Sequence, residues 1–121
     1  MYKNEELSKA FNKAKQRSLI ARSFVKVKLT QKLAWEIFFS ALPVPREIDS
    51  CEVLYYANKF YENKTLSMLH YILIDATTNI ISKGFGIITA FLESGIKEAE
   101  IYILFLPNDK YYGHYTGAPN L

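Results

Sequence analysis

Few side chains in this sequence could act as nucleophiles or general bases. The chain contains one cysteine, Cys51, and two histidines, His70 and His114, which stand far apart. A helix start near Cys51 could lower the pKa of its thiol, but a lone cysteine without a histidine partner is weak evidence for a nucleophile. His70 sits in an apolar segment, where a core histidine is the usual explanation. We therefore expect no enzyme activity, no metal site and no cofactor.

A second group of residues has no obvious use in an ordinary buried strand. Residues 82–91 read SKGFGIITAF, in which a lysine and a phenylalanine stand beside two glycines. Glycine loses the most backbone entropy on folding and offers no side chain to pack, so two glycines in an expected strand need a reason. A bare backbone beside Lys83 and Phe85 would let a flat ligand and its phosphates approach a sheet closely.

The first quarter of the chain is strongly basic. Residues 1–33 carry nine lysines and arginines against two acidic residues, Glu5 and Glu6, whereas the whole chain has a net charge of only +3. A basic segment attached to a mildly acidic body steers association with a polyanion or an acidic partner. The alternative is a solvated basic helix with no partner.

This basic segment has a helical period over residues 5–23. Three of its cations recur every four residues beside a thin apolar stripe, and they are candidate contacts to a polyanion such as a nucleic acid: Lys9, Lys13 and Arg17. The stripe is too thin to form a core by itself. We expect it to dock on something larger.

The length of 121 residues supports one hydrophobic core. We expect one globular domain over residues 34–121, preceded by a basic amphipathic extension over residues 1–33. No apolar run reaches the roughly 18 residues of a membrane span, so we expect no membrane partner. The single cysteine favours an intracellular compartment, and the basic start fits a mitochondrial address or a nuclear basic patch, with a slight lean to the mitochondrion.

The centre of the chain has clear local signals. Asp49 and Glu52 form a capping box that predicts a helix. Residues 66–74 and 80–92 are expected to be two strands, joined by a turn at residues 75–79.

Three other segments fit more than one structure. Residues 24–29 alternate with period two, which fits a short strand or an extended connector. Residues 37–42 are rich in strand formers, although a helix over residues 33–42 is also possible. Residues 93–106 fit a helix capped by Ser94 or a strand.

With a first strand at residues 37–42, the order of elements resembles that of the RNA recognition motif family. Residues 83–90 (KGFGIITA) resemble the octamer of that family, and residues 37–42 (IFFSAL) resemble its hexamer. The resemblance covers about residues 35–109, and it departs from the family at Ile87, where an aromatic residue is usual, and at Ala41, where asparagine is usual. It implies an α+β, ferredoxin-like βαββαβ sandwich, with a possible short last strand in the tail.

The resemblance also implies roles for individual residues. Phe38 and Phe85 would stack on RNA bases, Lys83 would contact a phosphate, and Ile87 would occupy a third stacking position without a ring. The implied function is the binding of single-stranded RNA by a small subunit of a ribonucleoprotein assembly. The alternative is a protein–protein scaffold subunit of such an assembly, with little RNA contact of its own. Neither function implies a small-molecule substrate.

Overall fold

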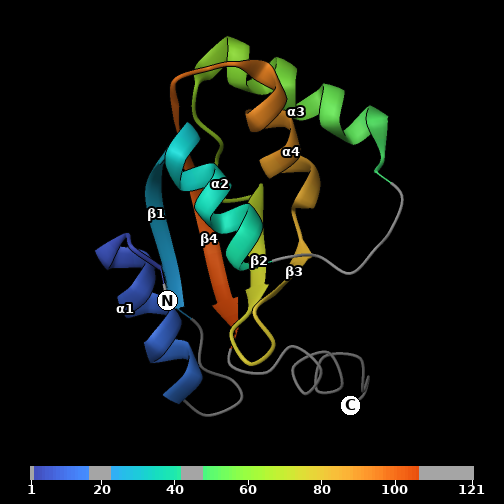
Figure 1. Cartoon of the computed structure of the whole chain (residues 1–121). Coiled ribbons are helices and arrows are strands. Elements are labelled where there is room, and N and C mark those ends of the chain that lie inside the picture. The colour runs from blue at the N-terminus through green and yellow to red at the C-terminus, as the bar shows by residue number, and fades with distance from the viewer. Residues whose placement is uncertain (1, 17–22, 42–47, 107–121) are drawn as a thin grey trace.

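The chain folds into a four-stranded sheet with helices packed against one of its faces (Figure 1). The computed structural model describes residues 2–16, 23–41 and 48–106. Its elements in chain order are α1 (Glu5–Gln16), β1 (Ser23–Thr30), α2 (Gln31–Ser40), α3 (Ser50–Asn63), β2 (Tyr71–Asp75), β3 (Ile80–Lys83), α4 (Phe85–Ser94) and β4 (Glu98–Leu106). The tail, for which a possible last strand was expected, lies outside the described residues.

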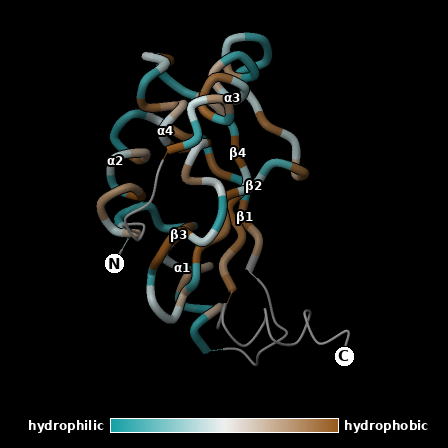
Figure 2. Tube along the Cα trace, turned by 90° about the vertical axis from the view of Figure 1, so that its right-hand side faces the viewer, coloured by the Kyte–Doolittle hydropathy of each residue, from teal (hydrophilic) through white to brown (hydrophobic). Residues whose placement is uncertain are grey.

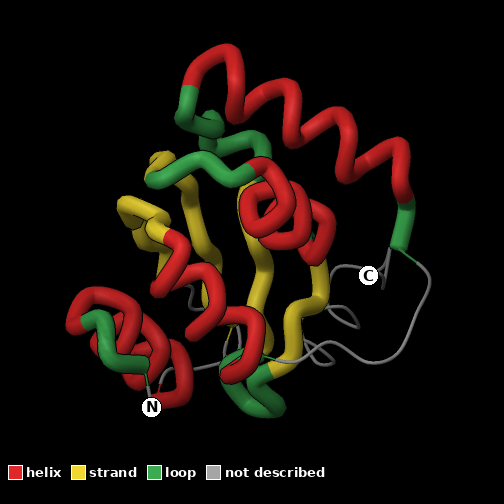
Figure 3. The backbone as a smooth tube through the Cα atoms, turned by 45° about the horizontal axis from the view of Figure 1, so that its top comes forward, coloured by secondary structure: helices red, strands yellow, loops and turns green. Residues whose placement is uncertain are grey.

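The sheet is mixed, with the spatial order β1-β4-β2-β3. β4 pairs antiparallel with β1 and parallel with β2, and β2 pairs antiparallel with β3. Helices α1, α2 and α4 lie on one side of the strands, while α3 packs on α4 (Figure 3). The predicted α+β class is confirmed. No helix in the described ranges combines the length and the apolar character needed to cross a membrane.

The strand expected at residues 37–42 is wrong, because residues 37–40 belong to helix α2, which ends at Ser40; Leu42 lies outside the described residues. The side chain of Thr30 caps the helix by accepting a hydrogen bond from the backbone N–H of Leu33 at 3.2 Å. The buried positions Leu33 and Ile37 then lie one helical turn apart, on the face that packs inward. Cap and spacing together outweigh the strand preference of the aromatic residues, and the alternative of a helix here is confirmed.

The strand expected over residues 80–92 is wrong beyond Lys83, where the chain turns into helix α4. The turn occurs at Gly84, whose φ of +94° is a left-handed conformation that favours glycine. A Cβ atom added there would lie 2.9 Å from the Cα of Ile72 and 3.1 Å from the carbonyl oxygen of Tyr71. The glycine is therefore needed for a strand-to-helix turn packed tightly against β2.

The strand expected over residues 66–74 is wrong before Tyr71, where β2 begins. The structure also decides three further local predictions. The carboxylate of Asp49 accepts hydrogen bonds from the backbone N–H groups of Cys51 at 2.9 Å and Glu52 at 3.3 Å, so the predicted helix cap is confirmed. The alternating segment near the start is a strand, β1, and the ambiguous segment near the end contains a strand, β4.

Helix α1 is part of the core, and the structure shows no N-terminal extension separate from the body. Its side chains Leu7, Phe11 and Ala14 are buried. The ring of Phe11 lies 5.6 Å from that of Phe105 in β4 and 5.4 Å from that of Tyr2. Figure 2 shows the apolar stretches of the strands gathered in the middle of the fold.

Tyr2 ties the start of the chain to the turn between β2 and β3. Its hydroxyl donates a hydrogen bond to the side-chain oxygen of Asn79 at 2.9 Å. Burial, and secondarily the nearby Glu36 carboxylate, raise the pKa of the Tyr2 phenol above its ordinary value. The neutral hydroxyl is the form that can donate this hydrogen bond.

The placement of Phe11 predicts a large loss of stability on truncation. Phe11→Ala should lower the free energy of unfolding in urea by about 3–5 kcal/mol, because it opens a cavity between α1 and β4. Lys13→Ala on the exposed side of the same helix should change it by less than about 0.5 kcal/mol. Equal unfolding curves for Phe11→Ala and the wild type would mean that α1 is a detached arm.

The two glycines with positive φ make a matched pair for a second test. Gly95→Ala, at a φ of +76° with open space around the new Cβ, should cost only the backbone strain of about 1–2 kcal/mol. Gly84→Ala should cost clearly more, because its Cβ also collides with the backbone of β2. Urea unfolding of both variants checks the difference, and similar losses would contradict the close approach of β2.

Candidate nucleic-acid interface

The face of the sheet turned away from α1, α2 and α4 is the candidate interface, and we call it the open face. Side chains of β1 alternate across the sheet: Val27 and Leu29 are buried toward the helices, whereas Lys26 and Lys28 are exposed on the open face. In the described part of the chain, no helix covers this face (Figure 3).

Three aromatic side chains from three strands meet on the open face: Phe24 of β1, Tyr71 of β2 and Tyr102 of β4. The Phe24 ring lies 5.8 Å from the Tyr71 ring and 5.6 Å from the Tyr102 ring, steeply inclined to both. Strand register explains the meeting, because Tyr102 is paired with Tyr71 on one side and with Lys26 on the other. We call these three residues the aromatic cluster. Phe24 is 42% exposed, and both tyrosines are half-buried.

Two lysines flank the aromatic cluster. The ammonium of Lys83, at the end of β3, lies 4.5 Å from the centre of the Tyr71 ring, and that of Lys26 lies 6.0 Å from the centre of the Tyr102 ring. Both distances are within the range of cation–π attraction, which contributes about 0.5–1 kcal/mol at exposed sites. The edges of the cluster are thus positively charged.

The lysines differ in their carboxylate partners. Lys26 pairs with Glu100 at 3.4 Å and Lys28 pairs with Glu98 at 3.6 Å, both at exposed positions where such pairs contribute little. Lys83 forms no ion pair with any residue in the described ranges. It is therefore the lysine of the open face whose charge is least compensated.

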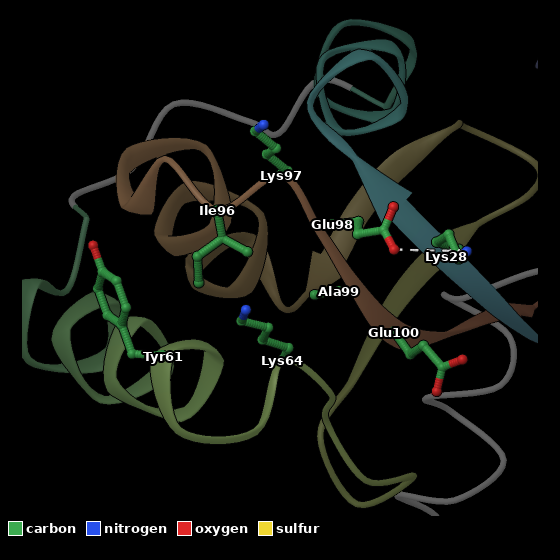
Figure 4. A pocket seen from close by; sticks show the side chains of 8 residues that line it. All are labelled: Lys28, Tyr61, Lys64, Ile96, Lys97, Glu98, Ala99 and Glu100. Atoms are coloured by element: carbon green, nitrogen blue, oxygen red, sulfur yellow. Dashed lines mark ion pairs between the residues drawn. The ribbon is translucent and has the colours of Figure 1, made fainter.

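A pocket of about 650 Å³ lies beside these ion pairs, between the open face and the end of α3 (Figure 4). Its lining includes five charged residues: Lys28, Lys64, Lys97, Glu98 and Glu100. Figure 4 shows Lys64 extending toward Ile96, whereas Glu98 turns toward Lys28. The pocket therefore mixes both signs of charge, and none of the three residues of the aromatic cluster lines it.

The residues predicted as stacking platforms lie elsewhere. Phe38 on α2 and Phe85 at the start of α4 stack on each other, with ring centres 5.7 Å apart and planes inclined by 25°. Both therefore belong to the helix layer. Ile87 is only 1% exposed within the core, so its placement on a ligand-binding sheet face is wrong. The physical reason is the turn at Gly84, which puts the octamer-like segment into a helix.

The predicted cations are divided between the two layers. Lys83 lies on the open face. Lys9 and Lys13 are exposed on α1, which packs against the opposite face, so the structure does not bring them to the aromatic cluster. Arg17 lies outside the described residues.

The aromatic cluster was not predicted from the sequence, although part of its signal is visible there. The alternation in residues 24–29 places Phe24 and Lys26 on one face of a strand, and the segment EIYILFL does the same for Glu100 and Tyr102. No local pattern indicates that these two segments pair with each other. Only their pairing creates the cluster.

The residues with catalytic potential are dispersed. Cys51 is exposed at the start of α3, and His114 lies outside the described residues. His70 Nδ1 is 3.3 Å from the hydroxyl of Tyr56, whose pKa is raised by burial and then by the charge of Glu52. Among the described residues, no group of three or more His, Cys, Asp and Glu side chains is arranged to hold a metal ion.

Comparison of the chain with protein-family models, with curated proteins and with solved structures gave no match.

Proposed function

We propose that this chain binds single-stranded RNA on the open face of its sheet, through the aromatic cluster. The observation that carries the proposal is the meeting of Phe24, Tyr71 and Tyr102, with two lysines at the edge, on a sheet face that no described helix covers. Solvent-facing strand positions normally carry polar residues, so three rings there need a function.

The chemistry of the cluster suits unpaired bases. Each base stacked on an aromatic side chain contributes about 1–3 kcal/mol, and stacking tolerates any base. Bases in a duplex are already stacked on one another, which makes single strands the better ligand. Lys83 and Lys26 are placed to meet the phosphates that follow the stacked bases. The proposed activity is binding without catalysis, in keeping with an intracellular subunit of a ribonucleoprotein assembly.

The proposal keeps the function implied by the resemblance to RNA recognition motifs but assigns it to other residues. From β1 onward the elements follow the order β-αα-β-β-α-β, which is compatible with a ferredoxin-like arrangement that has a helix pair in place of its first helix. In this arrangement the first strand contributes Phe24 and the last strand contributes Tyr102. Lys83 is the only residue shared by the two assignments.

Substitution of the cluster should weaken RNA binding selectively. Phe24→Ala and Tyr71→Ala should each reduce the affinity for a labelled single-stranded RNA of mixed sequence by about 1–3 kcal/mol. Phe39→Ala, which removes an exposed ring from the helix layer, is the matched control and should bind like the wild type. Fluorescence anisotropy with the single strand and with its duplex measures the effect. The proposal fails if the wild type binds neither RNA, or if only Phe39→Ala loses affinity.

Lys83 should account for part of the salt dependence of binding. If its ammonium meets a phosphate, Lys83→Gln should lower the slope of log affinity against log salt concentration by about 0.7, the value for one ionic contact to a single strand. Lys13→Gln on α1 should leave the slope unchanged, because that helix lies on the opposite side of the sheet. If only Lys13→Gln altered the slope, the RNA phosphates would be bound along α1 and not by Lys83.

A further inference from the structure

We propose a second binding site on the helix layer: an apolar groove that takes an amphipathic, basic helix of a partner protein. The groove lies where α2, α4 and α3 follow one another across the fold (Figure 1). It consists of two adjoining pockets of about 220 and 490 Å³, both of which are lined by Ile48 and Glu93. It is independent of the open face and of the proposed RNA binding.

The walls of the groove are apolar and aromatic. Trp35 and Phe38 of α2 and Phe85 of α4 form one end, and Val53 and Leu54 of α3 line the other. Trp35 is 45% exposed and stacks on Phe39, which is 62% exposed, with ring centres 5.4 Å apart. Large apolar side chains gathered in this way on a protein surface mark interaction sites, and tryptophan is prominent among the residues that dominate binding energy.

The groove calls for a helical occupant. Apart from Ile48, its walls are helices, whose backbone groups are already paired within each helix, so they cannot extend a sheet with an incoming strand. An occupant must satisfy its own backbone hydrogen bonds, and an amphipathic helix laid into a groove does so. Along α3 the lining runs from Ser50 to Tyr61, which is about 16 Å at the helical rise, or three turns of a bound helix.

The charges around the groove select a basic occupant. Glu93 lies where the two pockets join, is exposed, and forms no ion pair with another described residue. No lysine or arginine of the described chain lines either pocket. A helix with lysine or arginine beside its apolar stripe would complement Glu93.

A second copy of this chain does not supply such a helix from its described residues. The basic amphipathic helix among the described elements is α1. Its apolar side chains Leu7, Phe11 and Ala14 are already buried in the core of the same molecule. Docking α1 into the groove of another copy would expose that core. Among the described residues no helix of a second copy fits the groove, and the proposal assigns it to a different protein.

Trp35 provides a direct test, because it is the single tryptophan of the chain and stands in the wall of the groove. The probe is a designed helical peptide with leucines along one face and lysines beside them, titrated against the full chain. We expect a saturable blue shift of the Trp35 emission. A scrambled peptide of the same composition should give none, and a peptide with glutamate in place of lysine should bind about tenfold more weakly.

Two groove variants and one control make the test specific. Leu54→Ser, at a position that is 62% exposed and so tolerant of change, should weaken the lysine peptide about tenfold. Glu93→Lys should reverse the preference, so that the glutamate peptide binds more tightly. Leu69→Ser, at a position that is 82% exposed and outside the groove lining, should bind the lysine peptide like the wild type.

The proposal is overturned if the Trp35 emission does not shift. It is also overturned if the scrambled peptide binds the wild type as tightly as the lysine peptide does, or if the groove variants bind the lysine peptide as tightly as the wild type does. A shift that grows with protein concentration in the absence of peptide, together with a dimer in sedimentation, would assign the groove to a second copy and reject the partner helix. Urea unfolding of each variant, unchanged from the wild type, ensures that lost binding reflects the groove itself.

Discussion

The fold depends on strand β4, because both of its edges and both of its faces are in use. One edge pairs with β1 along the whole of that strand, and the other pairs with β2. Beyond β2, Glu100 exchanges backbone hydrogen bonds with Lys64 and Leu66 at 3.0 and 2.9 Å. On one face Phe105 contacts the ring of Phe11, and on the other Tyr102 contacts the ring of Phe24. The core and the open face are therefore built on the same strand.

This dependence explains why the basic start of the chain is not an extension. β1 lies at the edge of the sheet, and α1, which precedes β1 in the chain, packs against β1 and β4. Without α1, the rings of Phe105 and Tyr2 would lose the aromatic contact that Phe11 provides. Charge composition indicated a separate segment, whereas the buried stripe of α1 decides the packing.

Local sequence signals predicted an element where the cap stands out in the sequence, and they failed where strand-forming or uniformly buried residues concealed a helix. The cap at Asp49 predicted α3, and the alternation in residues 24–29 allowed the strand β1 without excluding an extended connector. Helix α4 was missed because its residues from Gly86 to Phe91 are all buried, which leaves no polar face to show a helical period. In α2, the bulky strand formers concealed a helix whose cap lies in the preceding strand residue, Thr30.

The candidate site was harder to predict than the elements, since its residues come from three strands and meet only through pairing between distant segments. The resemblance pointed to an aromatic, basic sheet face, but it placed that surface on segments that form helices. Lys83 was predicted as a phosphate contact from the octamer-like segment, and it lies on the open face because β3 ends at this residue, before Gly84. Its ammonium reaches the ring of Tyr71. The other open-face residues required knowledge of strand order, which no local pattern contains.

The lysines of β1 also have a purely structural explanation. It accounts for these lysines but not for the aromatic residues of the open face. β1 is an edge strand, and lysines on an edge strand hinder pairing with the sheet of another molecule. That role accounts for Lys26 and Lys28, but it gives no reason for three neighbouring rings on the same face. The two proposed sites also differ in charge: cations flank the rings of the open face, whereas Glu93 lies in the groove. The two proposals therefore assign a polyanion to the open face and a basic helix to the groove, on surfaces of opposite charge that lie on different layers of the fold.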